Sequence, residues 1–409
     1  MAVIHKILGT HSHSAVVNAF FVVVLLLGTF FSLVGVRSYQ NLQSNAQSLG
    51  TELSSVKQSS EEAVSKLQEE LASNSAQLEK IQNEDQRLRN NELEKTLKST
   101  QEVYRNVLSL YESMIDLREG KGKGLPMDKT FASILSDLSS TNYGSASAKM
   151  SQLTKDIAAQ AAKDAANVPA NVAVSNSAPG SGYSRQSVQT SIGTYVIDIV
   201  AGDLSSTKVI VDTASDSTCG NNCPVLPLAT YVARSGAFAG INGSYFCPES
   251  YPSCAGKTNS FDLLVMNKNK VYFNSDNNVY SQNPVAIFSG GSARFLSKAQ
   301  DWGRDSGVDS VISNFPLLLI NGQNQFGGNA DPKMGSKGSR SFIGAKGSKA
   351  YIGVVRNVTV AEMATVLQTL GLDHAINLDS GGSTALWANG GYKAGPGRSL
   401  PNVVLFVRK

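Results

Sequence analysis

The chain has 409 residues, of which 41% are hydrophobic and 17% charged. This length exceeds a typical single domain, and the composition excludes a wholly disordered chain, a collagen-like chain and a multi-span membrane protein. The formal net charge of +4 is unevenly distributed: residues 38–120 carry 9 Lys/Arg and 14 Asp/Glu, a net −5, whereas residues 169–409 carry 19 and 14, a net +5. Neither part has the basic excess of a nucleic-acid surface, so we expect no nucleic-acid partner.

An apolar run near the N-terminus predicts a membrane anchor. Residues 15–36 contain no charge, and at 1.5 Å per residue a helix of this length spans a hydrocarbon core of ~30 Å. A cleaved signal peptide is the alternative, but its apolar region is usually about 7–15 residues long and ends in a small-x-small site. We therefore expect a cytoplasmic tail at 1–14, a transmembrane anchor at 15–36 and a single-pass membrane protein.

The stretch that follows the anchor predicts a coiled-coil stalk over residues 38–120. It contains no proline, and its apolar residues recur in steps of three, four and seven, which is typical of a long helix with one apolar seam. A lone helix leaves such a seam exposed, so we expect a homo-oligomer through residues 38–120. A solvated, partly frayed monomeric stalk is the alternative. The seam residues are Leu42, Leu49, Leu53, Val56, Leu67, Leu71, Leu78, Ile81, Leu88, Leu93 and Leu97.

Two connecting segments lead to the C-terminal domain. A glycine-lysine repeat ends the stalk, and residues 121–167 are expected to form a weakly helical connector. Residues 168–184 are rich in Pro, Ala, Asn, Ser and Gly, which indicates a flexible linker. Residues 185–409 remain as a domain that is large enough to bury a core.

Cysteine usage indicates the compartment. Four cysteines lie within a short stretch of loops in the C-terminal domain, which favours disulfides formed in an oxidising environment, with three pairings open. A four-cysteine zinc site is disfavoured because C-x3-C is followed by the wider C-x6-C. With the anchor, the cysteines place the C-terminal domain outside the cytoplasm. They are Cys219, Cys223, Cys247 and Cys254.

The C-terminal domain is predicted to be strand-dominated with few helices, an α+β fold. Short β-branched runs are separated by turn residues. One helix is expected from the capping box Thr359-Val-Ala-Glu362, with Gly371 as its stop. The runs that predict strands are 195–200, 208–211, 238–241, 263–266, 285–288, 316–320, 350–355, 375–378 and 403–407.

Four segments in chain order resemble those of the phosphodiester glycosidase domain family, over roughly residues 190–408. Ser244 and Ser380 stand where that family usually has glycine. Arg398 and Asn402 fall in the family's closing Arg-x-x-x-Asn stretch. The segments are Gly240-Ile-Asn-Gly-Ser-Tyr-Phe246, Pro316-Leu-Leu-Leu-Ile-Asn-Gly322, Arg340-Ser-Phe-Ile-Gly344 and Ala375-Ile-Asn-Leu-Asp-Ser-Gly-Gly-Ser383.

Each candidate residue also has a plainer interpretation. Asp379 either caps the turn that follows it, or stabilises an oxocarbenium-like centre, binds a divalent cation or orients a sugar hydroxyl. The Gly381-Gly382-Ser383 turn is either an ordinary tight turn or an anion-binding backbone concavity. Arg340 is either a surface arginine or a forked donor to phosphate. Asn242-Gly243 resembles a hairpin turn on spacing alone.

Two other hydrolase chemistries find weaker support. A serine hydrolase is rejected because no histidine follows Ser383 to act as base; His374 precedes it and is expected to satisfy backbone groups. A two-carboxylate glycosidase needs a second acid, but the domain's glutamates are Glu249 and Glu362, and Glu362 already belongs to the capping box. Any second carboxylate is therefore an aspartate that the sequence does not identify.

The resemblance implies a hydrolase of glycosidic phosphodiesters in phosphorylated glycans. It implies catalytic roles for Asp379, facing the anomeric centre, and for Arg340, which would hold phosphate with the Gly381-Gly382-Ser383 turn. Asn242, Gly243, Asn377 and Arg398 would bind or position the substrate. The resemblance implies no definite cofactor, and a divalent cation at Asp379 is left open. The alternatives are a non-catalytic protein that binds anionic glycans and oligomerises through its stalk, and a purely structural spacer.

Overall fold

A computed structural model describes residues 11–82, 85–118, 127–166, 172–278, 280–304 and 307–409. The chain divides into two compact units, 1–98 and 99–409. The described part of the first unit consists of helix α1 (His11–Gln82) and the beginning of helix α2 (Asp85–Arg118). The second unit contains the rest of α2, two further helices and a domain of three β-sheets.

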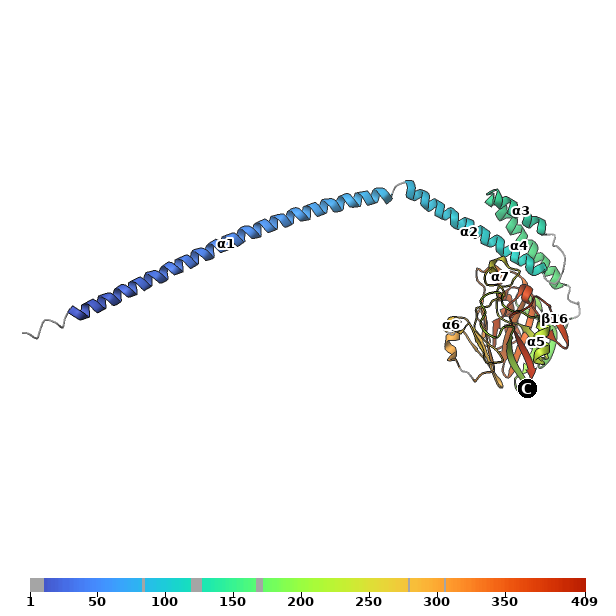
Figure 1. Cartoon of the computed structure of the whole chain (residues 1–409). Coiled ribbons are helices and arrows are strands. Elements are labelled where there is room, and N and C mark those ends of the chain that lie inside the picture. The colour runs from blue at the N-terminus through green and yellow to red at the C-terminus, as the bar shows by residue number, and fades with distance from the viewer. Residues whose placement is uncertain (1–10, 83–84, 119–126, 167–171, 279, 305–306) are drawn as a thin grey trace, which may run out of the picture. The chain divides into compact units, whose positions relative to one another are not determined.

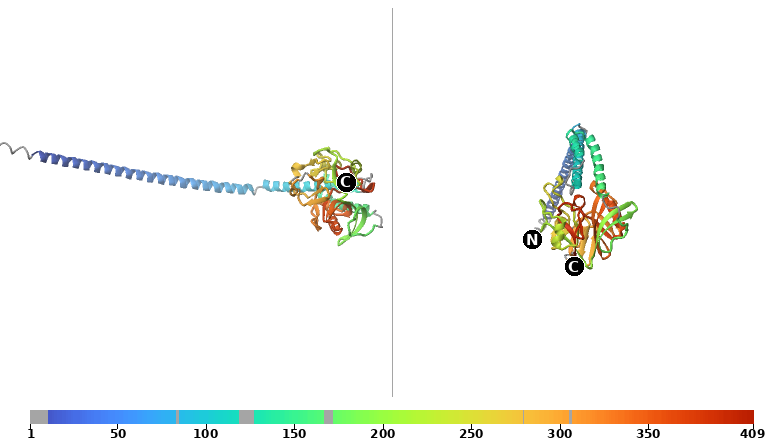
Figure 2. Two further views of the ribbon diagram at one scale, coloured as in Figure 1. Left: turned by 90° about the horizontal axis from the view of Figure 1, so that it is seen from below. Right: turned by 90° about the vertical axis from the view of Figure 1, so that its right-hand side faces the viewer.

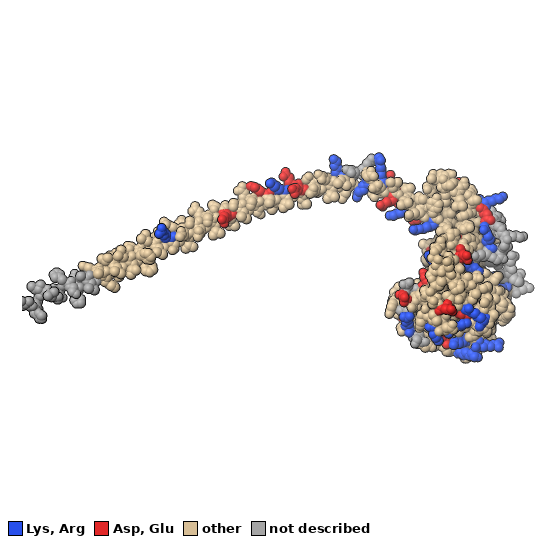
Figure 3. Space-filling view, viewed as in Figure 1, with Lys and Arg blue, Asp and Glu red and all other residues tan. Residues whose placement is uncertain are grey.

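Helix α1 is long and apolar enough, over Asn18–Gln82, to cross a membrane, judged by length and composition. Figure 3 shows the N-terminal stretch of its described residues without charged side chains, as the uncharged run requires. The seam leucines of α1 and α2, from Leu42 to Leu97, are exposed in the single chain. Since nothing in the described residues covers the seam, the coiled-coil stalk stays a prediction.

The second half of α2 packs with helices α3 (Asp128–Ser139) and α4 (Tyr143–Ala166) (Figure 1). The three helices share an apolar core that includes Val107, Met114 and Leu153. The residues expected to form a weakly helical connector therefore contribute a helical hairpin with its own buried side chains. The packing leaves a polar face of α2 free to contact the β-sheet domain.

Three antiparallel sheets form the C-terminal domain. Figure 2 shows the ribbon of this domain from two further sides. The first, in spatial order, contains β1 (Gly182–Thr190), β2 (Gly193–Asp203), β13 (Lys349–Val358), β12 (Gly338–Lys346), β14 (His374–Asn377), β10 (Leu317–Ile320) and β11 (Gln323–Asn324). The second contains β16 (Gly391–Ala394), β15 (Leu386–Ala388), β4 (Ala239–Asn242), β17 (Asn402–Arg408) and β3 (Thr207–Thr213). The third contains β6 (Tyr272–Phe273), β5 (Val265–Met266), β9 (Ser310–Ser313), β7 (Val285–Ser289) and β8 (Ser292–Leu296).

Short helices and turns complete the domain. They are α5 (Leu228–Ser235), α6 (Ser275–Asn278), α7 (Pro332–Gly335), α8 (Val360–Thr369) and the 3₁₀ turns η1 (Pro252–Cys254), η2 (Ala299–Trp302) and η3 (Gly381–Ser383). The main core lies between the sheets and takes residues from all three, such as Ile352, Val404 and Ile312. Helix α8 buries Met363 and Leu367 against the first sheet. Because side chains alternate between the faces of a strand, the first sheet is buried by the core on one face and by α8 on the other.

The capping box predicted for α8 is confirmed. Thr359 Oγ1 accepts a hydrogen bond from the Glu362 amide, and Glu362 accepts one from the Thr359 amide. Gly371 follows the helix with φ +72°, a conformation that glycine adopts without strain. Both helix boundaries are therefore determined by local sequence.

Part of the segment expected to be a flexible linker is held against the domain. Ser175 and Ser187 are joined by a backbone hydrogen bond of 2.9 Å, and the Gln186 side chain donates to the carbonyl groups of Ser175 and Ser177. The Ala178 amide donates to the Leu370 carbonyl. These bonds to β1 and to the end of α8 give a polar segment the backbone partners that its composition alone does not reveal. Residues 168–171 of this segment lie outside the described residues.

The four cysteines form two disulfides, which confirms the disulfide prediction over the zinc alternative. Cys219 pairs with Cys223, and Cys247 pairs with Cys254. Each bond closes a short loop, and the second loop contains Tyr251 and Ser253.

Candidate active site

The site is built where strands β4 and β14 end side by side. The Asp379 amide donates to the Gly243 carbonyl at 3.0 Å, and Asn242 Nδ2 donates to the Asp379 carbonyl at 2.6 Å. Asn242 is fully buried, and its Oδ1 accepts hydrogen bonds from the Ser341 hydroxyl and the Ala385 amide. Asn242 thus fixes the backbone that carries Asp379, through both the nitrogen and the oxygen of its side-chain amide.

Gly243 is required by a close backbone approach. A Cβ atom at this position would lie 1.9 Å from Asn402 Oδ1 and 2.7 Å from the Asn402 carbonyl oxygen. Asn402 Oδ1 also accepts a hydrogen bond from the Ser244 amide at 2.9 Å, and the Ser244 hydroxyl is buried beside it. The Asn242-Gly243 pair therefore allows the chain after β4 to pack closely against Asn402 and to hold the backbone of Asp379.

The turn after Asp379 folds as the 3₁₀ turn η3. Gly381 has φ +64°, and the Arg398 amide donates to the Gly382 carbonyl at 2.9 Å. The Asp379 carboxylate accepts hydrogen bonds from the Ser380 amide at 2.9 Å and from the Ser383 side chain. The capping interpretation of Asp379 is thus part of its role, and it holds the carboxylate against the glycine turn.

The electrostatics of Asp379 place its titration close to neutral pH. Burial raises the pKa of the Asp379 carboxyl to about 6, against the opposing effects of the Ser383 hydrogen bond and the Arg398 charge. The neighbouring Asp116 carboxylate raises the pKa further. A carboxyl group that titrates in this range, next to cations and a glycine turn, is typical of a catalytic acid or base.

Arg340 lies in the same cluster of charges, but much of its guanidinium is engaged. It lies on β12 and is 9% exposed. Its Nε donates to the Val358 carbonyl at 3.3 Å, and its Nη2 donates to the carbonyl groups of Lys333 and Ser336. Burial lowers the pKa of Arg340, whereas the charges of Asp116 and Asp379, among others, raise it. Arg340 therefore ties the α7 segment to β12 while its positive charge acts on Asp379.

Asn377 precedes Asp379 by two residues and is fully buried. Its Nδ2 donates to the Tyr245 hydroxyl at 2.5 Å and to the Phe315 carbonyl at 3.0 Å. Its Oδ1 is buried and has no hydrogen-bond partner within the described residues. A buried acceptor without a partner costs about 1–3 kcal/mol, so this oxygen is a candidate contact for a ligand.

Asp116, Glu112 and Tyr251 lie at the site but were not identified from the sequence. The Asp116 carboxylate of α2 forms an ion pair with Arg398 Nη2 and accepts a hydrogen bond from the Tyr251 hydroxyl at 2.7 Å. One turn earlier on α2, Glu112 accepts from Lys333 Nζ at 2.7 Å and from the Ser253 hydroxyl. Asp116 and Arg398 are 282 positions apart, so no local pattern could have joined them.

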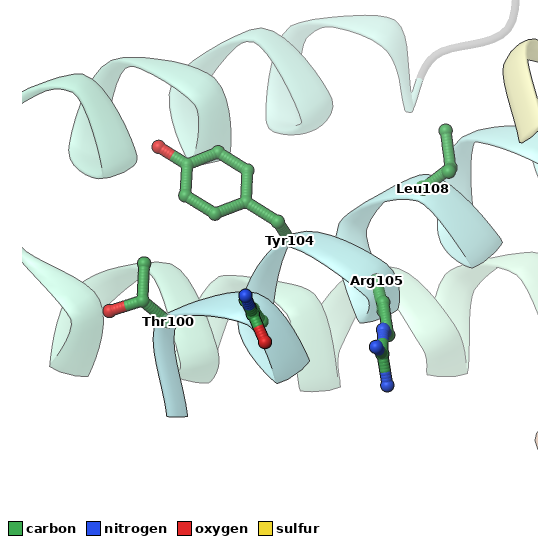
Figure 4. A pocket seen from close by; sticks show the side chains of 5 residues that line it. Thr100, Tyr104, Arg105 and Leu108 are labelled. Carbon is green, nitrogen blue, oxygen red and sulfur yellow. The ribbon is translucent and has the colours of Figure 1, made fainter. Parts of the chain in front are cut away.

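A surface hollow on α2 lies on a different stretch of that helix. Figure 4 shows Tyr104 and Arg105 pointing to different sides of the helix. The lining residues all come from α2, and none belongs to the cluster around Asp379. They are Thr100, Gln101, Tyr104, Arg105 and Leu108.

Residues 235–407 match the family model described as phosphodiester glycosidase. No curated protein matches the sequence. A similar solved structure is the catalytic domain of zebrafish N-acetylglucosamine-1-phosphodiester alpha-N-acetylglucosaminidase, auto-inhibited by its pro-peptide, with 16% identity, a TM-score of 0.44 and coverage of 58% of this chain and 87% of that one.

Two further structures are more distant. One is a hypothetical protein from Synechocystis, with 14% identity, a TM-score of 0.39 and coverage of 55% of this chain. The match spans 62% of that protein, which is less than two thirds of its length. The other is a putative exported protein from Burkholderia pseudomallei, with 11% identity, a TM-score of 0.37 and coverage of 52% of this chain and 74% of that one. The resemblance carried by the four sequence segments is confirmed by the family model, which matches residues 235–407 as a phosphodiester glycosidase domain.

Proposed function

We propose that the C-terminal domain hydrolyses glycosidic phosphodiesters, cutting between the anomeric carbon of a sugar and a phosphate. The observation that carries the proposal is the Asp379 carboxylate, held against the Gly381-Gly382-Ser383 turn with its pKa raised to about 6 and the Arg398 charge acting on it. The family match of residues 235–407 supports the same reaction class.

The proposed reaction uses water as the nucleophile. The bond between the anomeric carbon and the phosphate oxygen breaks, water forms the new bond to that carbon, and the phosphate monoester leaves while the water proton passes to solvent or to the leaving group. A phosphate monoester is a good leaving group, so stabilising the positive charge on the sugar is the main demand on the protein. Ionised Asp379 meets that demand.

Phosphate binding is proposed for Arg398 and the η3 turn. Arg398 is 10% exposed at its side chain and reaches the turn through its own amide, which bonds the Gly382 carbonyl. Arg340 would stabilise the bound phosphate by its positive charge without contacting it through Nε or Nη2, because these atoms donate to the carbonyl groups of β13 and α7. We keep Asn242 and Gly243 as positioning residues, and Asn377 as a residue that offers an unsatisfied acceptor beside the site.

The location that we propose is the outer face of a membrane. The apolar N-terminal helix would anchor the chain, and the two disulfides favour an oxidising compartment for the domain. The exposed leucine seam of α1 and α2 would join copies of the chain into a homo-oligomer. The substrate would then be a phosphorylated glycan of the envelope or the extracellular space.

Hydrolysis in water enriched in oxygen-18 tests the reaction. With a defined sugar-1-phosphodiester as substrate, cleavage at the anomeric carbon transfers the label to the anomeric hydroxyl of the released sugar. Label in the phosphate instead would make the protein a phosphodiesterase and refute the proposal. Binding of the compound without any release of sugar would favour a non-catalytic glycan-binding protein.

A further inference from the structure

Helix α2 presents two acids, one turn apart, to the rim of the candidate site. Residues four positions apart lie on the same face of a helix, with Cβ atoms about 5–6 Å from each other. Glu112 contacts Lys333 and Ser253, and Asp116 contacts Arg398 and Tyr251. Both acids therefore engage groups of the C-terminal domain, and the pair of Asp116 and Arg398 lies next to the glycine turn.

Two of the groups that they engage, Lys333 and Arg398, are cations that contact one aromatic ring. Lys333 Nζ and Arg398 Cζ each lie 4.8 Å from the centroid of the Tyr251 ring, within the range of a cation–π interaction. The disulfide between Cys247 and Cys254 closes the loop that carries Tyr251. The ring thus holds two positive charges within 4.8 Å of one centroid, and two cations held near each other suit a ligand with more than one negative charge.

Asp116 also occupies the space in front of the turn that we assign to phosphate. Its Oδ2 lies 2.6 Å from the place where a Cβ of Gly381 would be, so the carboxylate packs directly on this glycine. A phosphate on the same turn would meet a second anion at contact distance. Asp116 and a bound phosphate therefore exclude each other at Gly381.

We propose that Lys333 and Tyr251 extend the phosphate site of Arg398 and the η3 turn by a subsite for a further phosphate of a glycan that carries several phosphodiesters, and that Glu112 and Asp116 hold Lys333 and Arg398 until such a polyanion displaces them. The assignment to a glycan rests on the proposed function; the anion subsite itself rests on the contacts described above.

The two acids differ in how easily a polyanion displaces them. Burying an ion pair costs desolvation that offsets much of the attraction, but a buried carboxylate that loses its partner is strongly destabilising, so Asp116, with a side chain 24% exposed, is displaced at a lower cost than Glu112. The Lys333 side chain is 47% exposed, whereas that of Glu112 is 4% exposed, so solvent and ligand reach the cation more readily than the acid. A chain of phosphates offers more negative charge to the same cations than two carboxylates do, and it therefore competes effectively.

Binding of inorganic tripolyphosphate to the full-length protein in detergent tests the subsite without depending on catalysis. The variant E112Q/D116N should bind tripolyphosphate at least about tenfold more tightly than wild type, with a smaller gain for inorganic orthophosphate. Loss of the buried Glu112 charge could perturb the helices of the double variant. The single variant D116N keeps Glu112 and changes a partly exposed acid, so it should show part of the gain with the helices intact. Adding K333Q to the double variant should remove the gain.

A matched control separates the subsite from a general charge effect. E94Q/E102Q neutralises two exposed acids of the same helix and should change the affinity less than about threefold, because isolated surface charges contribute little. An equal gain in the control, no gain in E112Q/D116N, or a gain that survives K333Q would overturn the proposal. Tight binding of tripolyphosphate together with an absence of sugar release would refute the proposed hydrolysis and leave the subsite standing.

Discussion

The titration of Asp379 can be tested by the pH dependence of the reaction. Its pKa of about 6 in the folded protein means that its carboxylate is mostly ionised above that pH. Because the proposed role requires the ionised form, kcat/KM should rise as pH increases from 5 to 7 and level off above. A rate that falls above pH 6 would instead assign Asp379 as a general acid.

The same shift has a consequence for stability. The folded pKa of Asp379 lies above the ordinary value of 3.8, so the folded state binds more protons than the unfolded state between about pH 4 and pH 6. The contribution of Asp379 is therefore lost as pH rises through this window. The free energy of unfolding of the wild type should fall relative to that of D379N from pH 4 to pH 7, measured by urea titration.

Gly243 offers a purely steric test. Because a Cβ there would meet Asn402 at 1.9 Å, G243A should destabilise the domain by about 1–3 kcal/mol through overpacking. Gly338 starts β12 and has no atom within 4 Å of a built Cβ, so G338A serves as the matched control. Equal melting temperatures for the two variants would show that Gly243 is not held by this contact.

The candidate site residues that the sequence predicts as a group are those that lie close together in the chain. The stretch from Asn377 to Ser383 forms one strand end and one turn, so its spacing already places a carboxylate beside two glycines. Arg340 lies among the charges around Asp379 while its role in phosphate binding stays a prediction, and its bonds to the α7 segment depend on a fold that the spacing does not encode. Asp116 and Tyr251 reach the site across long sequence separations, through helix packing and a disulfide loop.

Among the elements, the strands that the sequence reveals are those with apolar runs. Each of the nine β-branched runs contains or overlaps a strand, and the α8 boundaries follow from its capping box and Gly371. Strands β1 and β12 escape detection because they are rich in Ser, Gly, Arg and Gln. They are held by backbone pairing to β2 and β13 rather than by their own hydrophobicity.

The loop closed by Cys247 and Cys254 makes a prediction at this scale. It carries Tyr251, so C247S/C254S should weaken tripolyphosphate binding in the E112Q/D116N background, because the ring under the two cations is no longer fixed. C219S/C223S removes the other short disulfide and provides the control. Equal losses of binding in both variants would indicate a general loss of stability instead.

For the whole molecule, the exposed leucine seam predicts self-association. Residues 38–409 should sediment as a dimer or trimer at micromolar concentration, and L71S/L78S should shift them toward monomer, since each change places a polar group in the seam. Q68S/Q77S alters exposed polar positions of the same helix and should leave the assembly intact. A monomeric wild type would leave the stalk as a spacer.

The role of Asp379 is tested by the turnover of a defined sugar-1-phosphodiester by two matched variants, with one substitution before β14 and one after it. Asp373 precedes this strand and Asp379 follows it. D379N should lower kcat about 100-fold or more while its melting temperature stays near that of wild type, and D373N should retain activity. Full activity in D379N would contradict the assignment of this carboxylate to the reaction and, with it, the proposed site.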